Sequence, residues 1–525
     1  MNFTEKRLQE GLTHHQSGNF PKAEKIYRAI LKKEPSHPEV NFLLGTLKLQ
    51  TGVLPQAEKL LQNTLRLNPN HISARKNLGI VYQNLGKQQE ALTTYEEFLT
   101  FEKNDPEVYF LLGNVLYEQG QMVEAIENYR KSIVLQPKDA EVHCNLAAAL
   151  HLENHLSEAL QSYENALSID PNLVKAYSNL GALLNIMGDY QGAAENCVKA
   201  LSLQPNDADA HMNLAVIFLL MGNYEKGWKE YEWRLALSKN KVLGTSQPIW
   251  NGEALNGKRI YIYSEQGFGD TIQFVRFLFE VKRRGGYVIL ACQEELCPFL
   301  RGFDAIDEII CNKDDAPLPP FDEYAPLLSL PGILGTRPET IPSFASYISV
   351  PTELDEKWKK YLEKDTSYKV GLSWAGASGN IFNRYRSCQL KEFAALSGIK
   401  NVTFYNLQYK AGINEPLDSP EGMEIISVED KIADFTDRAA FINNLDLVIT
   451  VDTSICHVAG SLGKKTWLLV SAVPDWRWLL EYPDTTPWYP DIQLFRQKNR
   501  DDWSDVFEGV RESLVEKMSE KGIKP

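Results

Sequence analysis

A pattern typical of a buried strand, near the C-terminus, ends in a short polar segment that could bind an anion. Residues 447–451 have the composition of a parallel strand, and Asp452, Thr453 and Ser454 follow directly. Small and apolar residues at helical spacing come next, so Thr453 or Ser454 can cap a helix whose free N–H groups point above the strand. His457 would lie on the first turn of that helix. Open α/β sheets bind ligands at this edge, and a helix N-terminus favours phosphate.

A second candidate loop follows another strand pattern earlier in the chain. Gly267 and Gly269 permit a tight turn with close approach of the backbone, and Asp270 begins an amphipathic stretch. A carboxylate at this place can take a proton from an attacking group, so Asp270 is our candidate general base and Glu265 is the alternative. In the competing interpretation, Asp270 only caps the helix that begins at Thr271.

Further polar side chains could complete such a site. Arg384 and Arg386 follow a glycine-rich loop, and their guanidinium groups can neutralise a leaving diphosphate as charge develops. Gln408 follows a strand pattern where nucleotide contacts are common, although a solvated loop is an equal alternative. His457 can contact a ligand or be a packed core residue. Asp452 would be repelled by a diphosphate, which favours contact with a sugar hydroxyl or a role in orienting the loop.

These residues need an α/β framework, and strand patterns alternate with helical patterns through the second half of the chain. We predict a linker at residues 237–257, a first α/β half at 258–350 and a second α/β half at 351–525 that ends in a helix. A proline-rich passage separates the two halves. Strands are expected at residues 259–263, 287–291, 308–310, 368–374, 402–407, 447–451 and 466–470.

The first half of the chain is a repeat array with a period of 34 residues. Small residues recur at Ala23, Ala57, Ala91, Ala125, Ala159, Ala193 and Gly227. Glycine, tyrosine and proline registers keep the same phase, which resembles the tetratricopeptide repeat, a pair of antiparallel helices per unit. About seven units span residues 4–236, and stacking of such units predicts a superhelix with a long concave groove that binds protein.

An asparagine register lies beside the glycine register in this groove. Its members are Asn77, Asn145, Asn179 and Asn213. An asparagine amide can both donate to and accept from a peptide backbone, so the register could hold an extended segment without reading its sequence. This arrangement resembles the asparagine ladder of O-GlcNAc transferases. Asparagine is also common at this position of ordinary repeats, and we weigh the two interpretations equally.

Composition excludes several classes of function. The chain has 525 residues and a formal net charge of −14, which argues against nucleic acid or an anionic membrane as the main partner. No apolar run approaches the roughly 20 residues of a membrane span, and we expect a cytoplasmic protein. The seven cysteines are predicted to be reduced core thiols, and a Cys292–Cys297 disulfide is the disfavoured alternative.

Taken together, these motifs resemble bacterial proteins that fuse tetratricopeptide repeats to a heptosyltransferase-like glycosyltransferase domain of family 9. The resemblance rests on the segments 265–270, 371–376, 386–387, 407–408, 452–457, 475–478, 488–490 and 496–497, in this order. It implies an α plus α/β chain, with an N-terminal solenoid followed by a GT-B transferase of two Rossmann-like halves. In such a transferase, residues 258–350 would form the acceptor side and residues 351–525 the nucleotide-sugar side. It also implies inverting transfer without a metal, and it adds Trp374 to the donor-binding residues. Related proteins often carry His and Asp where this chain has Asn380 and Asn383, which puts the donor or the activity in doubt.

The sequence therefore predicts a glycosyltransferase that moves a sugar from a nucleoside-diphosphate sugar, its co-substrate, to a protein held by the repeats. One alternative is a repeat scaffold whose transferase half is inactive and only binds nucleotide. Another is a transferase that acts on a glycan or a lipid-linked sugar. The sugar, the base, the acceptor atom and the oligomeric state stay open, and repeat arrays of this kind sometimes form homodimers.

Overall fold

The computed structural model describes residues 3–237, 244–312, 318–376, 383–408 and 419–525. The chain divides into two compact units: unit 1 contains residues 1–183 and 202–205, and unit 2 contains residues 184–201 and 206–525. None of the helices in the described ranges combines the length and the apolar character that a bilayer crossing requires. Asn380 and the rest of the glycine-rich loop after Gly376 fall outside these ranges.

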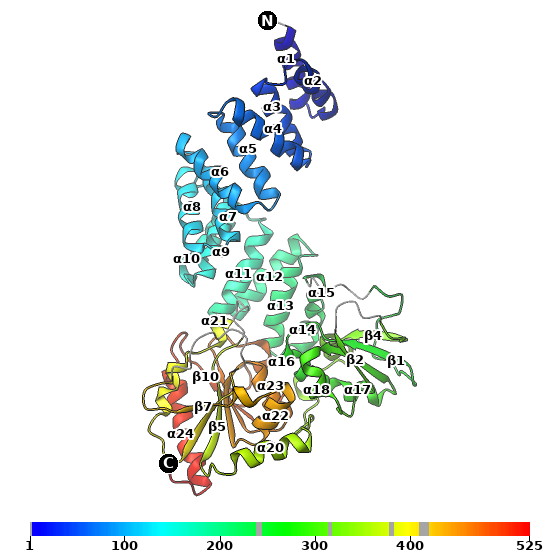
Figure 1. Cartoon of the computed structure of the whole chain (residues 1–525), viewed down its shortest axis with the longest axis vertical. Helices are drawn as coiled ribbons and strands as arrows, with labels where there is room; N and C mark the ends of the chain where they lie inside the picture. The colour runs from blue at the N-terminus through cyan, green and yellow to red at the C-terminus, as the bar shows by residue number, and fades with distance from the viewer. Residues whose placement is uncertain (1–2, 238–243, 313–317, 377–382, 409–418) are drawn as a thin grey trace. The chain divides into compact units, whose positions relative to one another are not determined.

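The N-terminal region is a series of helices that follow one another as antiparallel pairs (Figure 1). Their bounds are α1 (Phe3–Gln16), α2 (Phe20–Lys33), α3 (Pro38–Gln50), α4 (Leu54–Leu67), α5 (Ile72–Asn84), α6 (Gln88–Phe101), α7 (Pro106–Glu118), α8 (Met122–Leu135), α9 (Ala140–Leu152), α10 (Leu156–Ile169), α11 (Val174–Met187), α12 (Tyr190–Leu203), α13 (Ala208–Leu220), α14 (Tyr224–Tyr231) and α15 (Arg234–Leu237).

The repeat registers explain why the helices pair so closely. Tyr95 on α6 is fully buried and lies against Gly79 on α5. A Cβ atom at Gly79 would come within 2.4 Å of the Tyr95 ring, so the helices can approach only with glycine at this position. Ala91, one turn before Tyr95, is also fully buried, and its methyl group fills the space between the helices.

The rest of unit 2 contains two parallel sheets in two consecutive halves of the chain. The first α/β half (residues 258–350) contains β1 (Arg259–Tyr263), α16 (Phe268–Phe274), α17 (Leu278–Arg283), β2 (Tyr287–Gln293), α18 (Cys297–Leu300), β3 (Glu308–Asn312), β4 (Glu323–Pro326) and α19 (Leu330–Ile333). Its sheet has the strand order β3-β2-β1-β4, and every strand pair is parallel.

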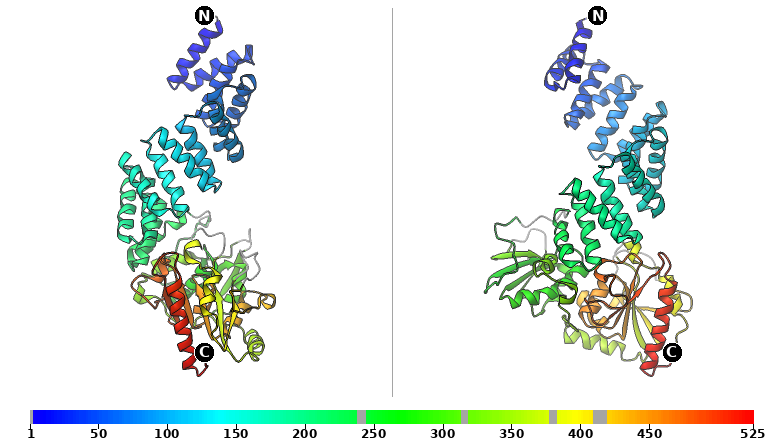
Figure 2. Two further views of the ribbon diagram at one scale, coloured as in Figure 1. Left: turned by 90° about the vertical axis from the view of Figure 1, so that its left-hand side faces the viewer. Right: turned by 180° about the vertical axis from the view of Figure 1, so that it is seen from behind.

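The second α/β half (residues 351–525) holds a larger sheet with the strand order β10-β9-β8-β5-β6-β7. Its elements are α20 (Thr352–Leu362), β5 (Tyr368–Ser373), α21 (Asn383–Arg386), β6 (Val402–Asn406), β7 (Ile425–Ser427), α22 (Phe435–Asn443), β8 (Leu447–Val451), α23 (Ser454–Ser461), β9 (Thr466–Val470), β10 (Ile492–Arg496) and α24 (Ser504–Glu520). Figure 2 shows α24, in red, alongside the strands of this sheet. The predicted α/β region with parallel strands is present.

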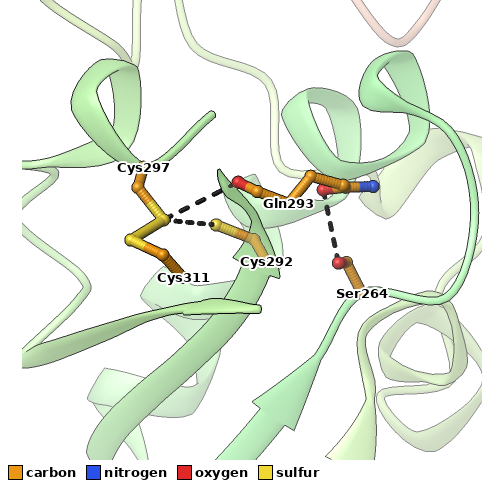
Figure 3. The surroundings of a disulfide bond; sticks show 5 residues. All are labelled: Ser264, Cys292, Gln293, Cys297 and Cys311. Carbon is orange, nitrogen blue, oxygen red and sulfur yellow. Dashed lines mark hydrogen bonds between the residues drawn. A yellow bond between two sulfur atoms is a disulfide. The ribbon is translucent and has the colours of Figure 1, made fainter. Parts of the chain in front are cut away.

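One expectation about the cysteines is wrong. Cys297, at the start of α18, forms a disulfide with Cys311 on β3, and their Cα atoms are 5.9 Å apart (Figure 3). The register of β2 against β3 places Cys311 opposite Cys292, so all three sulfur atoms gather at one point. Cys292 stays a free, buried thiol whose sulfur lies 3.8 Å from that of Cys297. The pairing of β2 with β3 and the turn from β2 into α18 thus bring Cys297 and Cys311 together, and the prediction that all seven cysteines are reduced does not hold for this pair.

Candidate functional site

A cavity of about 560 Å³ lies in unit 2, between the two α/β halves. Residues 266–270 line it from the first half, and Asp452, Thr453 and Ser454 line it from the second. The two loops approach closely because Gly269 has no side chain. A Cβ atom at Gly269 would come within 2.6 Å of the His457 ring. The structure thus brings the two loops that the sequence singled out to one cavity.

The predicted site residues divide into two groups. Those that line the cavity are Gly267, Gly269, Asp270, Arg386, Gln408, Asp452, Thr453, Ser454 and His457. Glu265, Trp374 and Arg384 are not among its lining residues. Trp374 is buried in a separate core of the second half, and Arg384 is exposed and donates to the Tyr385 hydroxyl at 3.2 Å.

Asp270 caps its helix, as one of the two interpretations predicted, and it also lines the cavity. It is the third residue of α16, and its Oδ2 accepts from the N–H of Gly267 at 2.9 Å, which caps the helix. Its Oδ1 accepts from Nη2 of Arg477, a residue of the second half. The side chain keeps 20% of its surface exposed, and it lines the cavity. The cap therefore orients the carboxylate and leaves it accessible.

Glu265 lies in a different place. Its side chain is only 4% exposed, and it pairs with Arg234 of α15 at 2.7 Å while it accepts from the N–H of Leu328 at 3.3 Å. Burial raises the pKa of Glu265, against the opposing effect of Arg234. This geometry joins the helix after the last repeat to the first α/β half, and it does not support Glu265 as a base in the cavity.

The N-terminus of α23 opens onto the cavity. Thr453 is the N-cap residue, as predicted, but its side chain makes no capping hydrogen bond. The hydroxyl instead lies 3.4 Å from the Thr450 hydroxyl. The N–H of Cys456 donates to the Thr453 carbonyl at 3.1 Å. Because the Thr453 side chain accepts from no first-turn N–H group, those of Ser454 and Ile455 can donate to a phosphate oxygen.

Burial shifts the pKa of Asp452 upward and the pKa of His457 downward. Burial and the nearby Asp475 raise the pKa of Asp452 to about 6, although Arg386 and Arg477 oppose this effect. Burial, with help from neighbouring arginines, lowers the pKa of His457 well below its usual range. Nδ1 of His457 lies 2.9 Å from the Tyr489 hydroxyl, and the side chain is 4% exposed. His457 is therefore a packed, neutral side chain at the edge of the cavity, which accommodates both interpretations of its role.

Gln408 and Asn383 shape the turn after β5. Oε1 of Gln408 accepts from the N–H of Ala375 at 3.0 Å, and its Nε2 donates to the Ala375 carbonyl at 2.6 Å. Oδ1 of Asn383 accepts from the N–H of Gly376 at 2.9 Å. Gln408 is thus a loop-holding residue that also lines the cavity, and Asn383 has a structural contact of its own. Arg386 lines the same edge of the cavity.

Sequence reasoning missed several residues of the cavity. Arg477 and Asp475 line it from η7 (Trp476–Trp478) and the residue before it. Gln293, at the end of β2, accepts from the Thr271 hydroxyl at 3.0 Å and donates to the Gln266 carbonyl at 2.6 Å. The segment 475–478 was noted only as part of the family resemblance, without a role for Asp475 or Arg477 in the site. Both tryptophans of that segment are buried, at 3% and 1% exposure, which agrees with core packing.

In the repeats, the asparagine register bonds along the array. The Asn77 amide donates to the Thr46 hydroxyl of the preceding repeat at 2.9 Å, and the Asn145 amide donates to Asn114 in the same way at 2.9 Å. Lys175 also donates to Oδ1 of Asn145. Asn179 and Asn213 are half-buried on α11 and α13. At least two of the four asparagine amides thus use some of their donors or acceptors in hydrogen bonds to neighbouring repeats.

Family models match most of the N-terminal region. A TPR repeat family matches residues 84–120, 113–153 and 149–185, and Tetratricopeptide repeat families match residues 14–78, 174–207 and 196–229. The predicted solenoid of tetratricopeptide repeats is confirmed. Repeats of this kind provide a protein-binding groove.

One curated relative is Protein FlbA of Caulobacter vibrioides. It is 29% identical over 316 residues, which cover 55% of this chain and 52% of the relative. The chain thus spans about half the length of this relative. Because the match covers more of the chain than the repeats contain, it extends beyond the solenoid.

Solved structures of repeat proteins are also similar. YrrB, described as a TPR protein with an unusual peptide-binding site, is 22% identical, with a TM-score of 0.32, over 35% of this chain and 95% of its own. PilF of Pseudomonas aeruginosa is 20% identical, with a TM-score of 0.36, over 39% of this chain and 94% of its own. Both likenesses concern the fold alone.

Proposed function

We propose that the protein is an inverting GT-B glycosyltransferase that moves a sugar from a nucleoside-diphosphate sugar to a protein segment bound by the repeats. One observation carries the proposal: a single cavity places the Asp270 carboxylate of one parallel sheet opposite the N-terminus of α23 in the other. A base and an anion site that face each other are what displacement at an anomeric carbon requires.

The proposed reaction uses these groups as follows. An acceptor hydroxyl or amide attacks the anomeric carbon, Asp270 takes the acceptor proton, and the bond from that carbon to the phosphate oxygen breaks. The diphosphate leaves with the bonding electron pair. The N–H groups of α23 and the guanidinium of Arg386 stabilise the charge that develops on it. Gln408 keeps the loop next to Arg386 in place.

Asp452 suits the sugar rather than the diphosphate. Its carboxylate is 8% exposed at the cavity wall, beside Thr453. A carboxylate can accept hydrogen bonds from two sugar hydroxyls, whereas it would repel phosphate. The acceptor is assigned to protein because the same chain carries a solenoid of about seven repeats with a groove of the protein-binding type.

A screen of nucleotide sugars tests the proposal. Binding should raise the melting temperature of the full chain, and the stabilising donor should then be turned over, either by transfer or by slow hydrolysis. Asp270→Asn keeps an oxygen that can cap α16, so it should bind the donor normally while turnover falls by about 10²–10⁴-fold. Glu265→Gln is the matched carboxylate change outside the cavity, and its kcat in the folded protein should stay within about threefold of wild type.

The outcomes separate the competing functions. Tight nucleotide binding with no turnover of any donor would contradict an enzyme and favour a scaffold. Turnover that Asp270→Asn leaves intact would contradict the assigned base. Transfer to a glycan or lipid-linked sugar, with no sugar-modified protein, would overturn the acceptor assignment alone.

A further inference from the structure

We propose that Arg477 is a positioning residue that holds Asp270 for catalysis; this inference rests on the proposed sugar transfer. Nη2 of Arg477 donates to Oδ1 of Asp270, and its Nε donates to Oε1 of Gln273 at 2.7 Å. Asp270 and Gln273 lie one turn apart on α16, in the first α/β half. The guanidinium group therefore binds two side chains on one face of the helix that carries the candidate base.

The third contact of Arg477 is with its own half. Nη1 donates to Oδ1 of Asp475 at 2.8 Å. The planar guanidinium thus binds three separate side chains, two on one sheet's helix and one on the loop after the other sheet's strand β9. This bridge spans 207 residues of sequence between Asp270 and Arg477. The position of the base is thereby tied to the half that is proposed to bind the donor.

The surroundings keep the Arg477 side chain in one place. It is 7% exposed, and its guanidinium lies 4.3 Å from the centre of the Trp476 ring and 5.9 Å from that of Phe274. Burial alone would lower the pKa of Arg477, but the carboxylates of Asp475 and Asp270 outweigh it and raise the pKa. The charge is therefore permanent, and the aromatic rings restrict its orientation.

Asp270 gains orientation from this contact. Gly267 already donates to Oδ2, so Arg477 supplies the partner of the second oxygen. A carboxylate can accept about four hydrogen bonds, so two further lone pairs of Asp270 can accept from a ligand in the cavity. Without Arg477, Oδ1 loses this partner and the carboxyl group can rotate about the Cβ–Cγ bond. A displacement of about 1 Å from the reacting geometry can cost about 10²-fold in rate.

Lysine cannot replace this arginine. An ammonium group is a compact charge without the fixed fork of donors, so it can satisfy Asp270 or Asp475 but not the three partners together. Arg477→Lys should therefore keep the local charge and the fold while it loses orientation. We expect kcat to fall by about 10-fold to 100-fold with the donor KM nearly unchanged.

A double-mutant cycle on the full chain tests whether Arg477 acts through Asp270. The four proteins are wild type, Arg477→Gln, Asp270→Asn and the double variant, assayed with the donor that the screen identifies. Arg477→Gln should lower kcat by about 10²-fold in the wild-type background and by less than about threefold in the Asp270→Asn background. Guanidinium chloride at low millimolar concentration should partly restore the kcat of Arg477→Ala and leave Arg283→Gln, an exposed control, unchanged.

Each result has one meaning. Losses that multiply in the double variant, or an Arg477→Gln change confined to the donor KM, would overturn the positioning role and make Arg477 a direct donor-binding group. Loss of cooperative unfolding in both Arg477→Gln and Arg477→Lys would overturn it in favour of a purely structural role. A wild-type chain that turns over no donor would refute the proposed function, and the inference would fall with it.

Discussion

Unit 1 and unit 2 bury their apolar side chains in different ways. In unit 1, buried residues form separate small clusters, such as Ala23 to Leu47 and Ala57 to Val81. In unit 2, one cluster includes Trp228 of α14, Phe274 of α16 and Trp488 of the second α/β half. The repeats therefore gain stability from neighbour to neighbour, whereas α14, α16 and part of the second α/β half share one core beside the cavity.

The last helix pair belongs to this shared core. The indole N–H of Trp228 donates to the Thr336 carbonyl at 3.2 Å, and its ring meets Trp476 edge-on at 5.4 Å. Tyr231 packs on the other edge of Trp476 at 5.9 Å. Trp476 in turn lies under Arg477. The final repeat, which belongs to unit 2, thus supports the cavity wall.

Truncation should give the largest difference between the units. A chain that begins at Leu184 keeps unit 2 nearly intact and should unfold cooperatively. A chain that begins at Leu237, at the predicted end of the repeats, loses Trp228, Tyr231 and Arg234 and should fail to fold, because the shared core is opened and Glu265 loses its partner. Urea unfolding followed by tryptophan fluorescence measures both, since all ten tryptophans lie at or after residue 228. Equal stability of the two chains would refute the shared core.

A change of pH should alter the free energy of unfolding of unit 2 through the titration of Asp452. The pKa of this residue is raised from 3.8 to about 6 in the folded state, so its stabilising contribution is complete below pH 3.8 and is lost as the pH rises through about 6. Asp452→Asn cannot titrate. Its free energy of unfolding, relative to wild type, should therefore increase by about 1–3 kcal/mol between pH 4 and pH 7.

The control for this series is in the same chain. Circular dichroism at a wavelength dominated by helices reports both units. The component of its transition that tryptophan fluorescence does not follow belongs to unit 1 and should show no difference between wild type and Asp452→Asn at any pH. A difference that does not depend on pH would show that Asp452 does not titrate in this range.

Asn145→Ala should have the smallest effect. The substitution removes the hydrogen bond to Asn114 and the one from Lys175, at a cost of about 1 kcal/mol to unit 1. The tryptophan-detected transition of unit 2 should not move. If the register also holds a protein acceptor, transfer to protein should weaken while donor hydrolysis stays constant. An equal loss of both activities would contradict an acceptor role for Asn145.

Local patterns predicted the framework well where burial is uniform. The apolar strands β1, β2, β5, β8 and β9 were recognisable because both faces of a parallel strand are buried. Strands β4, β7 and β10 were missed. Strand β4 ends in Pro326 at the edge of its sheet, β7 has only three residues at an edge, and β10 alternates buried and exposed residues at its start.

The residues of the candidate site also divide into some that local sequence patterns predicted and others that they did not. The places of Asp270 and Thr453 were predictable because each lies between the end of a parallel strand and the first turn of the next helix, and parallel strands deliver such segments to one edge of their sheet. Arg477 was not, since its contact with Asp270 joins residues that are distant in sequence. Glu265 is the reverse case, a residue that the sequence suggested for the site but that does not line the cavity. It also follows β1, but its side chain turns to Arg234, a choice that only tertiary packing decides.

The shared core also sets an order of events during synthesis. Trp228 and Tyr231 leave the ribosome roughly 250 residues before Trp476 and Trp488, which at about 5–20 residues per second is an interval of about 12–50 s. Unit 1 can fold as it emerges, because its contacts are local. The aromatic face of α14 must wait uncovered for its partners, so the nascent chain is most exposed to aggregation, and most dependent on chaperones, at the junction that later supports the cavity.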